Sequence, residues 1–162
     1  MAVRDKLTGA YNRQVFEELV DDAISLANKE SHPLSLAVID LDHFKQVNDN
    51  YGHPAGDLVL QRVVALCQRH IAQVGTLCRW GGEEFVFMFC NDDIDSAFVK
   101  VENLRKTIEN KNFVYENNNI YVTMTFGIIE RDSGKVDDVL LESADKLLYR
   151  GKINGKNVVV KA

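Results

Sequence analysis

The chain has 162 residues, of which 46% are hydrophobic and 27% are charged. This length suits one compact domain with its own core, and this balance excludes a disordered chain. The formal net charge of −5 argues against a broad binding surface for nucleic acid or for a membrane. Local cations or metal ions would have to hold any polyanionic ligand, because the overall field repels it.

The three cysteines, Cys67, Cys78 and Cys90, include no Cys-x-x-Cys pair. Their odd number and wide spacing argue against a disulfide framework or a zinc site, and predict buried thiols in a reducing compartment. The chain begins MAVRDKLTG, without an apolar signal region, and no apolar run approaches the length of a membrane span. We therefore expect a cytoplasmic domain.

The first two expected elements are an amphipathic helix and a strand. Residues 11–28 have a helical pattern, whose apolar positions include Val15, Leu19, Ile24 and Leu26. Residues 34–40 are a nearly continuous apolar run, which is typical of a central strand covered on both faces.

The later elements alternate between helices and strands around one hairpin. Helices are expected at 43–50, 55–71, 93–110 and 136–150, the hairpin strands at 75–80 and 83–90, and further strands at 120–129 and 157–160. From residue 34 the order is β-α-α-β-β-α-β-α-β. This order favours a ferredoxin-like split βαβ sheet flanked by helices, of the α/β (α+β) class, over a doubly wound sheet. No linker or repeat divides the chain, so one domain is expected over residues 1–162.

Carboxylates follow the apolar strand directly, in the sequence Asp40-Leu41-Asp42. Ligand sites in open α/β sheets lie at the carboxyl ends of strands. The Asp40 carboxylate and the Leu41 carbonyl are oxygen donors of the kind that magnesium takes. Asp42 by itself is explained equally well as a cap of the following helix.

That following helix offers groups for a phosphate and for a nucleotide. The amides of His43 and Phe44 at its start are free to bind a phosphate. Lys45 and Asn48 share its polar side and could face a nucleotide, although a solvated helix face would have the same pattern.

A second informative stretch is Arg-Trp-Gly-Gly-Glu-Glu-Phe at residues 79–85. Gly81-Gly82 supplies the positive φ angles of a tight hairpin turn. The apolar strand that follows predicts that the hairpin packs centrally in the sheet. If its neighbour is the strand at 34–40, Glu83 and Asp40 converge on one metal ion.

Four ordered segments together resemble the diguanylate cyclase (GGDEF) family, over essentially the whole chain. DKLTGAYNR at 5–13 resembles the family's opening motif, and DLDHFKQVNDNYGHPAGD at 40–57 its Asp-x-Asp-x-Phe-Lys segment. GGEEF at 81–85 is similar to the signature hairpin, and the residues from Ala144 to Asn157 to the closing segment. The resemblance implies a palm-like nucleotidyl cyclase. It would condense two GTP into cyclic di-GMP and two pyrophosphates in bacterial signalling, as a domain excised from a longer regulatory protein.

The resemblance also implies roles for individual residues at a metal site. Mg²⁺, with Mn²⁺ as the alternative, would be bound by Asp40, the Leu41 carbonyl and Glu83. Glu84 would bind a second metal. Glu83 would also act as the base for the ribose 3′-hydroxyl.

The substrate-binding residues come from the same resemblance. Those for guanine are Asn48 and Asp57, with His53 against the substrate. An ionised Asp57 can accept from both N1–H and the exocyclic amine of guanine, a donor pair that adenine lacks. Those for phosphates are Lys45, Lys152 and Lys156, beside the amides at the helix start. Lys156 stands where the family usually has Arg.

The expected partners follow from the product. Cyclic di-GMP joins two guanosine nucleotides with two-fold symmetry, so two domains, each with its own GTP, would have to face each other as a homodimer. No nucleic-acid polymer and no direct membrane contact are expected. Many members of the family have an inhibitory product site, Arg-x-x-Asp; here Ala72 and Gly75 occupy those positions, which predicts that this site is absent.

Two alternatives remain open at this point. The first is a catalytically silent module that binds GTP or a protein, although such a module usually lacks the acids that this chain has. The second is an enzyme of the same architecture that makes another cyclic nucleotide, which Asp57 disfavours.

Overall fold

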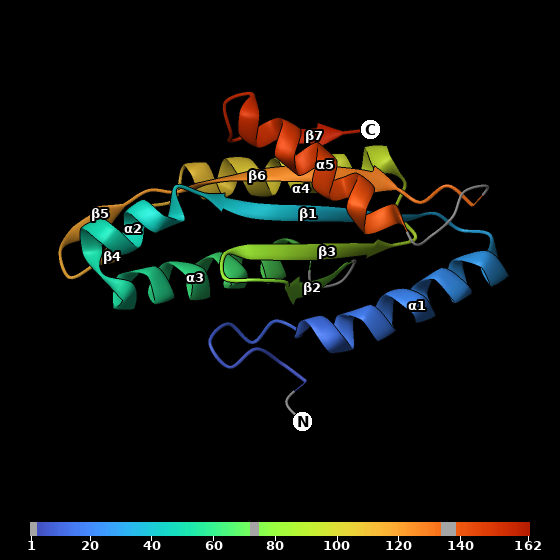
Figure 1. The fold of residues 1–162 in the computed structure, drawn as a ribbon, viewed down its shortest axis with the longest axis horizontal. Helices are drawn as coiled ribbons and strands as arrows, with labels where there is room; N and C mark the ends of the chain where they lie inside the picture. The colour runs from blue at the N-terminus through green and yellow to red at the C-terminus, as the bar shows by residue number, and fades with distance from the viewer. Residues whose placement is uncertain (1–2, 72–74, 134–138) are drawn as a thin grey trace.

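The fold is built on a five-stranded sheet with the strand order β2-β3-β1-β6-β7 (Figure 1). It is seen in a computed structural model that describes residues 3–71, 75–133 and 139–162. The strands are β1 (Leu34–Asp42), β2 (Gly75–Arg79), β3 (Glu84–Cys90), β6 (Thr123–Glu130) and β7 (Val159–Lys161). Within the described ranges, no helix is both long and apolar enough to cross a membrane.

The connectivity is that of two interleaved split βαβ units. Strand β3 pairs antiparallel with both β1 and β2, and β1 pairs antiparallel with both β3 and β6. Each unit therefore has two parallel strands with a strand of the other unit between them. This confirms the predicted ferredoxin-like sheet, to which β7 is added parallel to β6.

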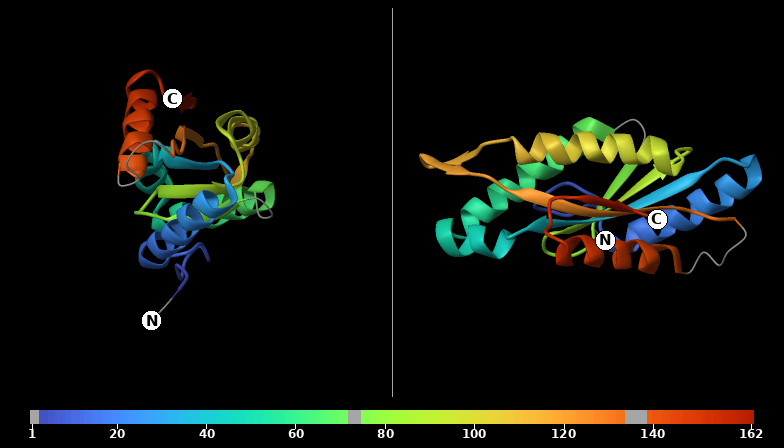
Figure 2. Two further views of the ribbon diagram at one scale, coloured as in Figure 1. Left: turned by 90° about the vertical axis from the view of Figure 1, so that its right-hand side faces the viewer. Right: turned by 90° about the horizontal axis from the view of Figure 1, so that it is seen from above.

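Helices cover both faces of this sheet (Figure 2). Helices α3 (His53–Ile71) and α4 (Ile94–Glu109) lie on one face, and α1 (Arg13–Glu30) and α5 (Leu140–Ile153) on the other. The short helix α2 (Phe44–Tyr51) follows the carboxyl end of β1. The predicted strand at 34–40 is thus central and covered on both sides, and it extends to Asp42.

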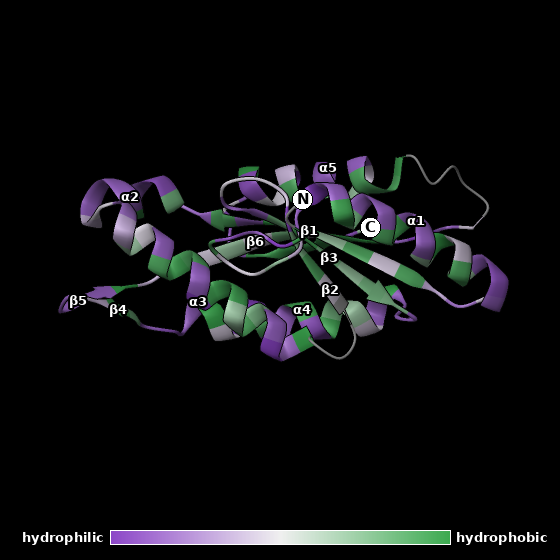
Figure 3. Cartoon of the chain, turned by 90° about the horizontal axis from the view of Figure 1, so that it is seen from below, coloured by the Kyte–Doolittle hydropathy of each residue, from purple (hydrophilic) through white to green (hydrophobic). Residues whose placement is uncertain are grey.

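Each face of the sheet has its own hydrophobic core. Alternate residues of β1, such as Ala37 and Ile39, pack with α3 and α4, and their neighbours Leu36 and Val38 pack with α1 and α5. Figure 3 shows the result, with apolar strands inside and the polar sides of the helices outward. Gly127 of β6 lets α5 lie very close to the sheet, because a Cβ there would stand 2.3 Å from the Ala144 carbonyl oxygen.

Helix α1 differs from its expected position. It begins at Arg13, because Asn12 is its N-cap and accepts from the Val15 amide, and it ends at Glu30. Its buried residues are Phe16, Ala23 and Ala27. Leu26, which was expected on the apolar face, is 46% exposed. Because Ala23 and Ala27 are small, the sequence pattern did not identify them as the buried face of the helix.

Two further differences lie in the second half of the chain. The strand expected from residue 120 begins at Thr123, and a separate hairpin precedes it, formed by β4 (Phe113–Tyr115) and β5 (Asn118–Ile120). Its turn residues Glu116 and Asn117 have positive φ angles within a polar run that resembles a loop. The helix expected at 136–150 is α5, Leu140–Ile153, and residues 136–138 lie outside the described residues. Its buried residues include Leu140, Ala144, Leu147 and Leu148, whereas Val139 precedes the helix and is exposed.

The cysteine prediction is correct in two cases out of three. Cys67 and Cys78 are buried free thiols, and Cys90 is a free thiol at the exposed end of β3. Burial raises the pKa of Cys78 to about 12, so this thiol stays protonated and unreactive.

Candidate active site

Strand pairing brings together the carboxylates at the carboxyl end of β1. Asp40 lies directly opposite Glu84 in the β1–β3 ladder, and the Leu41 amide donates to the Glu83 carbonyl oxygen at 3.2 Å. The signature hairpin is therefore the neighbour of β1, as predicted. The predicted turn geometry is wrong, because neither Gly81 nor Gly82 has a positive φ angle; residues 80–83 form a longer connection between β2 and β3. Metal binding by these acids stays a prediction.

The Asp40 carboxylate is partly buried, and its hydrogen-bonding capacity is only partly satisfied. Its side chain is 20% exposed, and within the described part of the chain its Oδ1 atom is buried without a hydrogen-bond partner. Burial raises its pKa to about 6; the Lys152 ammonium opposes that shift, and the nearby Glu83 and Glu84 carboxylates add to it. Three carboxylates, Asp40, Glu83 and Glu84, therefore lie close together beside one ammonium group, and Asp40 Oδ1 can still accept a bond.

This environment fits a hard divalent cation. Across residues 3–71, 75–133 and 139–162, no group of three or more His, Cys, Asp or Glu residues is arranged to hold a metal ion. Magnesium, however, commonly takes one or two carboxylates and completes its shell with water and phosphate oxygens. Asp40, the Leu41 carbonyl and Glu83 are suitable donors of that kind.

Asp42 does not cap the following helix, so that alternative is wrong. Its side chain is almost completely buried and accepts hydrogen bonds from the hydroxyls of Thr123 and Thr125 and from the Lys152 ammonium. The cap position of α2 belongs to His43, which has a left-handed backbone (φ 59°) and makes no side-chain cap bond. The first amides of α2, at His43 and Phe44, therefore have no side-chain cap competing with a phosphate.

A cavity of about 380 Å³, lined in part by Glu83, lies between α2, α3 and the hairpin. Its lining includes Lys45, Asn48, His53, Asp57 and Glu83, together with Phe44, Leu60, Arg79 and Gly82. The structure thus gathers around one cavity the three residues predicted for guanine and substrate, two of the residues predicted for phosphate (Phe44 and Lys45), and the predicted base.

Gly56 explains how Asn48 fits into this cavity. A Cβ atom at residue 56 would stand 1.9 Å from the Asn48 Oδ1 atom, so only glycine leaves room for that amide beside α3. This packing role of Gly56 was not predicted from the sequence. Its position one residue before Asp57, within the segment at 40–57 that resembles the family, was the one sequence feature that pointed to it.

The two C-terminal lysines lie at the other side of the acids. Lys152, on α5, has its Nζ atom 2.6 Å from Asp42 Oδ1 and 3.6 Å from Asp40 Oδ2. Lys156 lies in the loop before β7 with a left-handed backbone (φ 63°), and its amide donates to the Gly151 carbonyl oxygen. Lys152 is therefore close to the predicted metal ligands, and its phosphate role stays a prediction.

Comparison with known proteins identifies the family. A family model described as "Diguanylate cyclase, GGDEF domain" matches residues 2–158. The chain belongs to this family. The match covers nearly the whole chain and confirms both the predicted family and the predicted fold class.

Relatives of the GGDEF domain include curated proteins and solved structures. Diguanylate cyclase A of Treponema denticola is 37% identical over 84% of this chain and 37% of its own length. Response regulator PleD of Caulobacter vibrioides is 31% identical over 99% of this chain and 36% of its own length. The GGDEF domain of DgcB from Caulobacter crescentus, crystallised with c-di-GMP, has a TM-score of 0.94 at 32% identity and covers 99% of this chain and 96% of that one. The chain thus spans little more than a third of the length of these two curated relatives.

The GGDEF hairpin is anchored by the N-terminal segment, which the sequence analysis did not foresee. The Arg79 Nη1 atom binds both carboxylate oxygens of Asp5 at 3.1 and 3.2 Å, and its Nη2 atom donates to the Gly82 carbonyl oxygen at 2.8 Å. Thr8 donates to the same Asp5 carboxylate from its amide and its hydroxyl. The opening motif of the GGDEF domain therefore supports the turn that carries Glu83.

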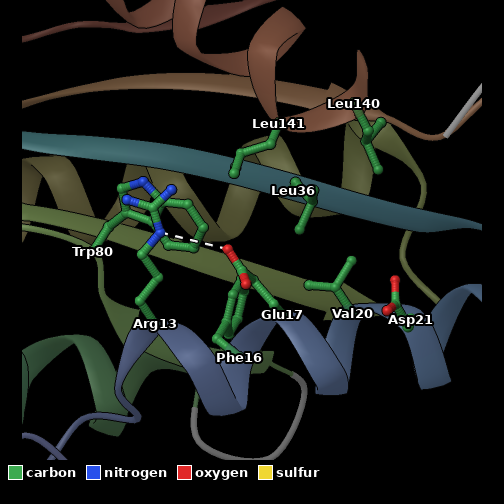
Figure 4. Close-up of a pocket in the computed structure, with 9 residues that line it drawn as sticks. All are labelled: Arg13, Phe16, Glu17, Val20, Asp21, Leu36, Trp80, Leu140 and Leu141. Carbon is green, nitrogen blue, oxygen red and sulfur yellow. Dashed lines mark hydrogen bonds and ion pairs between the residues drawn. The ribbon is translucent and has the colours of Figure 1, made fainter. Parts of the chain in front are cut away.

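Trp80, which precedes Gly81-Gly82 in the chain, lies against side chains of α1, as Figure 4 shows. The Arg13 guanidinium lies 4.1 Å from the centroid of the Trp80 ring and pairs with Glu17, and Phe16 meets that ring edge-on at 6.3 Å. These side chains line a cavity of about 420 Å³ between α1 and α5, on the opposite face of the sheet from the cavity between α2, α3 and the hairpin. Packing against α1 is thus the role of Trp80, where the family often has Tyr.

Only one of the two positions of the predicted missing inhibitory site lies within the described residues. Gly75, at the expected Asp position, begins β2. Ala72, at the expected Arg position, lies outside the described residues. The absence of this site therefore stays a prediction from the sequence.

Proposed function

We propose that this GGDEF domain is a diguanylate cyclase that condenses two GTP into cyclic di-GMP and two pyrophosphates. The observation that carries the proposal is the position of Asp40 beside Glu84 and the turn residue Glu83, which itself lines the cavity with Asn48 and Asp57. The named cyclases among its relatives support the same activity.

Guanine selection is assigned to Asp57 and Asn48. The Asp57 carboxylate accepts from N1–H and from the exocyclic amine, and the Asn48 amide can donate to and accept from the base edge. Adenine would leave the carboxylate without those donors, and an acceptor that the bound base shields from water is costly to leave unpaired. His53, on the same cavity wall, lies against the substrate.

The triphosphate is assigned to the cations and amides around α2 and α5. Lys45 and Phe44 line the cavity, His43 precedes α2, and Lys152 lies beside Asp40 and Asp42, with Lys156 in the loop that follows α5. These local charges are needed because the domain as a whole is acidic. Magnesium, or manganese in its place, bound by Asp40, the Leu41 carbonyl and Glu83, with Glu84 at a second ion, would neutralise phosphate charge and stabilise the leaving pyrophosphate.

Glu83 is assigned as the base. Its carboxylate takes the proton of the 3′-hydroxyl of one GTP as that oxygen attacks the α-phosphorus of the other, and the bond to pyrophosphate breaks. Each domain holds one GTP, so two domains face each other across a two-fold axis to close the ring. A cytoplasmic location, where GTP is available, goes with this activity.

The test measures pyrophosphate and cyclic di-GMP from GTP and Mg²⁺. Glu83→Gln is expected to lower product formation at least about a hundredfold, because it removes both the base and a metal ligand. Glu18→Gln, at an exposed site on α1, is the matched control and should leave the rate unchanged. A wild-type chain that binds GTP without releasing pyrophosphate would be a silent binding module, and one that prefers ATP would be a cyclase of another kind.

A further inference from the structure

The buried carboxylate of Asp42 has a complete set of hydrogen-bond donors. Its Oδ1 atom accepts from the Thr125 hydroxyl at 2.7 Å and from the Lys152 ammonium at 2.6 Å. Its Oδ2 atom accepts from the Thr123 hydroxyl at 2.8 Å and from the Asn157 amide at 3.0 Å. The side chain is 1% exposed, so these protein groups take the place of water.

Only one of these four partners requires a negative charge. A hydroxyl or a backbone amide is satisfied by any oxygen acceptor, including the carbonyl of an uncharged side chain. An ammonium group taken out of water needs a counter-charge. The charge of Asp42, as distinct from its shape, therefore serves Lys152.

The position of that ammonium matters because Asp40 is so close. Lys152 Nζ stands between the two aspartates, 2.6 Å from Asp42 and 3.6 Å from Asp40. A lysine side chain is long and loses considerable rotamer freedom when it is fixed. Asp42 fixes it in advance, before a phosphate arrives.

We propose that Asp42 is a positioning residue for substrate, acting through Lys152. It holds the ammonium at the edge of the acid cluster, where the triphosphate of GTP binds in the proposed function, on which this inference rests. It also accepts from the Asn157 amide and so fixes the loop that carries Lys156. One buried carboxylate thereby sets the position of both C-terminal lysines.

The test is a double-mutant cycle on binding. The variants are Asp42→Asn, Lys152→Met and the two combined, and the ligand is a GTP analogue with a methylene bridge between the α- and β-phosphorus, in Mg²⁺. Each single variant is expected to weaken the affinity by about tenfold, and the double variant by about tenfold as well, because both remove the same contact. Guanosine, which has no phosphate, should bind all four proteins alike. In turnover the change should appear in KM more than in kcat.

Thr123→Val is the matched control. It removes another donor to the same carboxylate and leaves Lys152 in place, so it should lower the melting temperature while the affinity for the analogue changes by less than about twofold. An Asp42→Asn effect no larger than that of Thr123→Val would make Asp42 a structural anchor only. Effects that multiply in the double variant would overturn the proposal as well. If Asp42→Asn does not fold, Asp42→Glu, which keeps the charge but displaces it, takes its place in the cycle and should be equally non-additive with Lys152→Met.

The outcome separates this inference from the proposed function. If the wild-type chain forms cyclic di-GMP but the two substitutions have additive effects, the proposed function stands and the positioning role of Asp42 is wrong. If the chain releases no pyrophosphate but the two substitutions are coupled, the proposed function is wrong and Asp42 stands as a positioning residue for phosphate binding. If the wild-type chain does not bind the analogue, both proposals are wrong.

Discussion

Asp40 and Asp42 are two residues apart and point to the same face of β1, but their hydrogen-bonding environments differ. Asp40 has a buried oxygen without a hydrogen-bond partner among the described residues, and its pKa is raised. Asp42 is more deeply buried, yet its hydrogen bonds from Lys152 and the two threonines outweigh burial and lower its pKa. One strand end thus carries an acid that is incomplete without a ligand and an acid that the fold completes by itself. Burial alone does not distinguish a binding residue from a structural one; the number of donors around it does.

The sharpest test of this contrast is Asp40→Asn, with the largest expected effect. Removing a proposed metal ligand should lower cyclic di-GMP formation at least about a hundredfold. The same change should leave the melting temperature in EDTA unchanged or raise it, because it removes an incompletely paired buried charge. Activity and thermal unfolding are measured on the same preparation. A clear loss of stability would show that Asp40 is held by contacts like those of Asp42.

Asp42→Ala should have the reverse outcome in stability. The substitution takes the acceptor from the Lys152 ammonium and from two hydroxyls, and one of two acceptors from the Asn157 amide. We expect this to lower the free energy of unfolding by about 3 kcal/mol. Urea denaturation measures this directly. Asp145→Ala, at an exposed site on α5, is the control and should change stability by less than about 0.5 kcal/mol. Equal effects at the two sites would contradict the structural role of Asp42.

Much of the site could be predicted because its signals are local. The apolar run before Asp40 predicted a central strand, and the Gly-Gly turn predicted a hairpin beside it. The spacing of Lys45 and Asn48 placed both on one side of α2, and both do line the cavity with Asp57. Each of these predictions depends on a few consecutive residues or on one helical turn.

What could not be predicted depends on residues far apart in the chain. The donors to Asp42 include Thr123 and Lys152, which are 81 and 110 residues away. Only the register of β1 against β6 and the close packing of α5 over Gly127 bring them together. Without that register, an acid before a helix has the pattern of a cap. The Asp5–Arg79 pair escaped prediction for the same reason, since 74 residues separate its partners.

Asp5 offers the smallest and most specific check, because it is a second carboxylate that the fold satisfies. Despite partial burial, its hydrogen bonds from Thr8 and Arg79 keep its pKa below the ordinary value of 3.8. A carboxyl whose pKa is lower in the folded state contributes stability above its unfolded pKa, and that contribution is lost as the pH falls through the folded pKa. Asp5→Asn should therefore cost less than about 1 kcal/mol at pH 7, since the pair is partly exposed, and the difference from wild type should shrink as the pH is lowered below about 4. Urea denaturation of both proteins across this range measures it. A difference that stays constant with pH would mean that Asp5 supports the hairpin by shape alone, and that its charge contributes nothing to the pairing with Arg79.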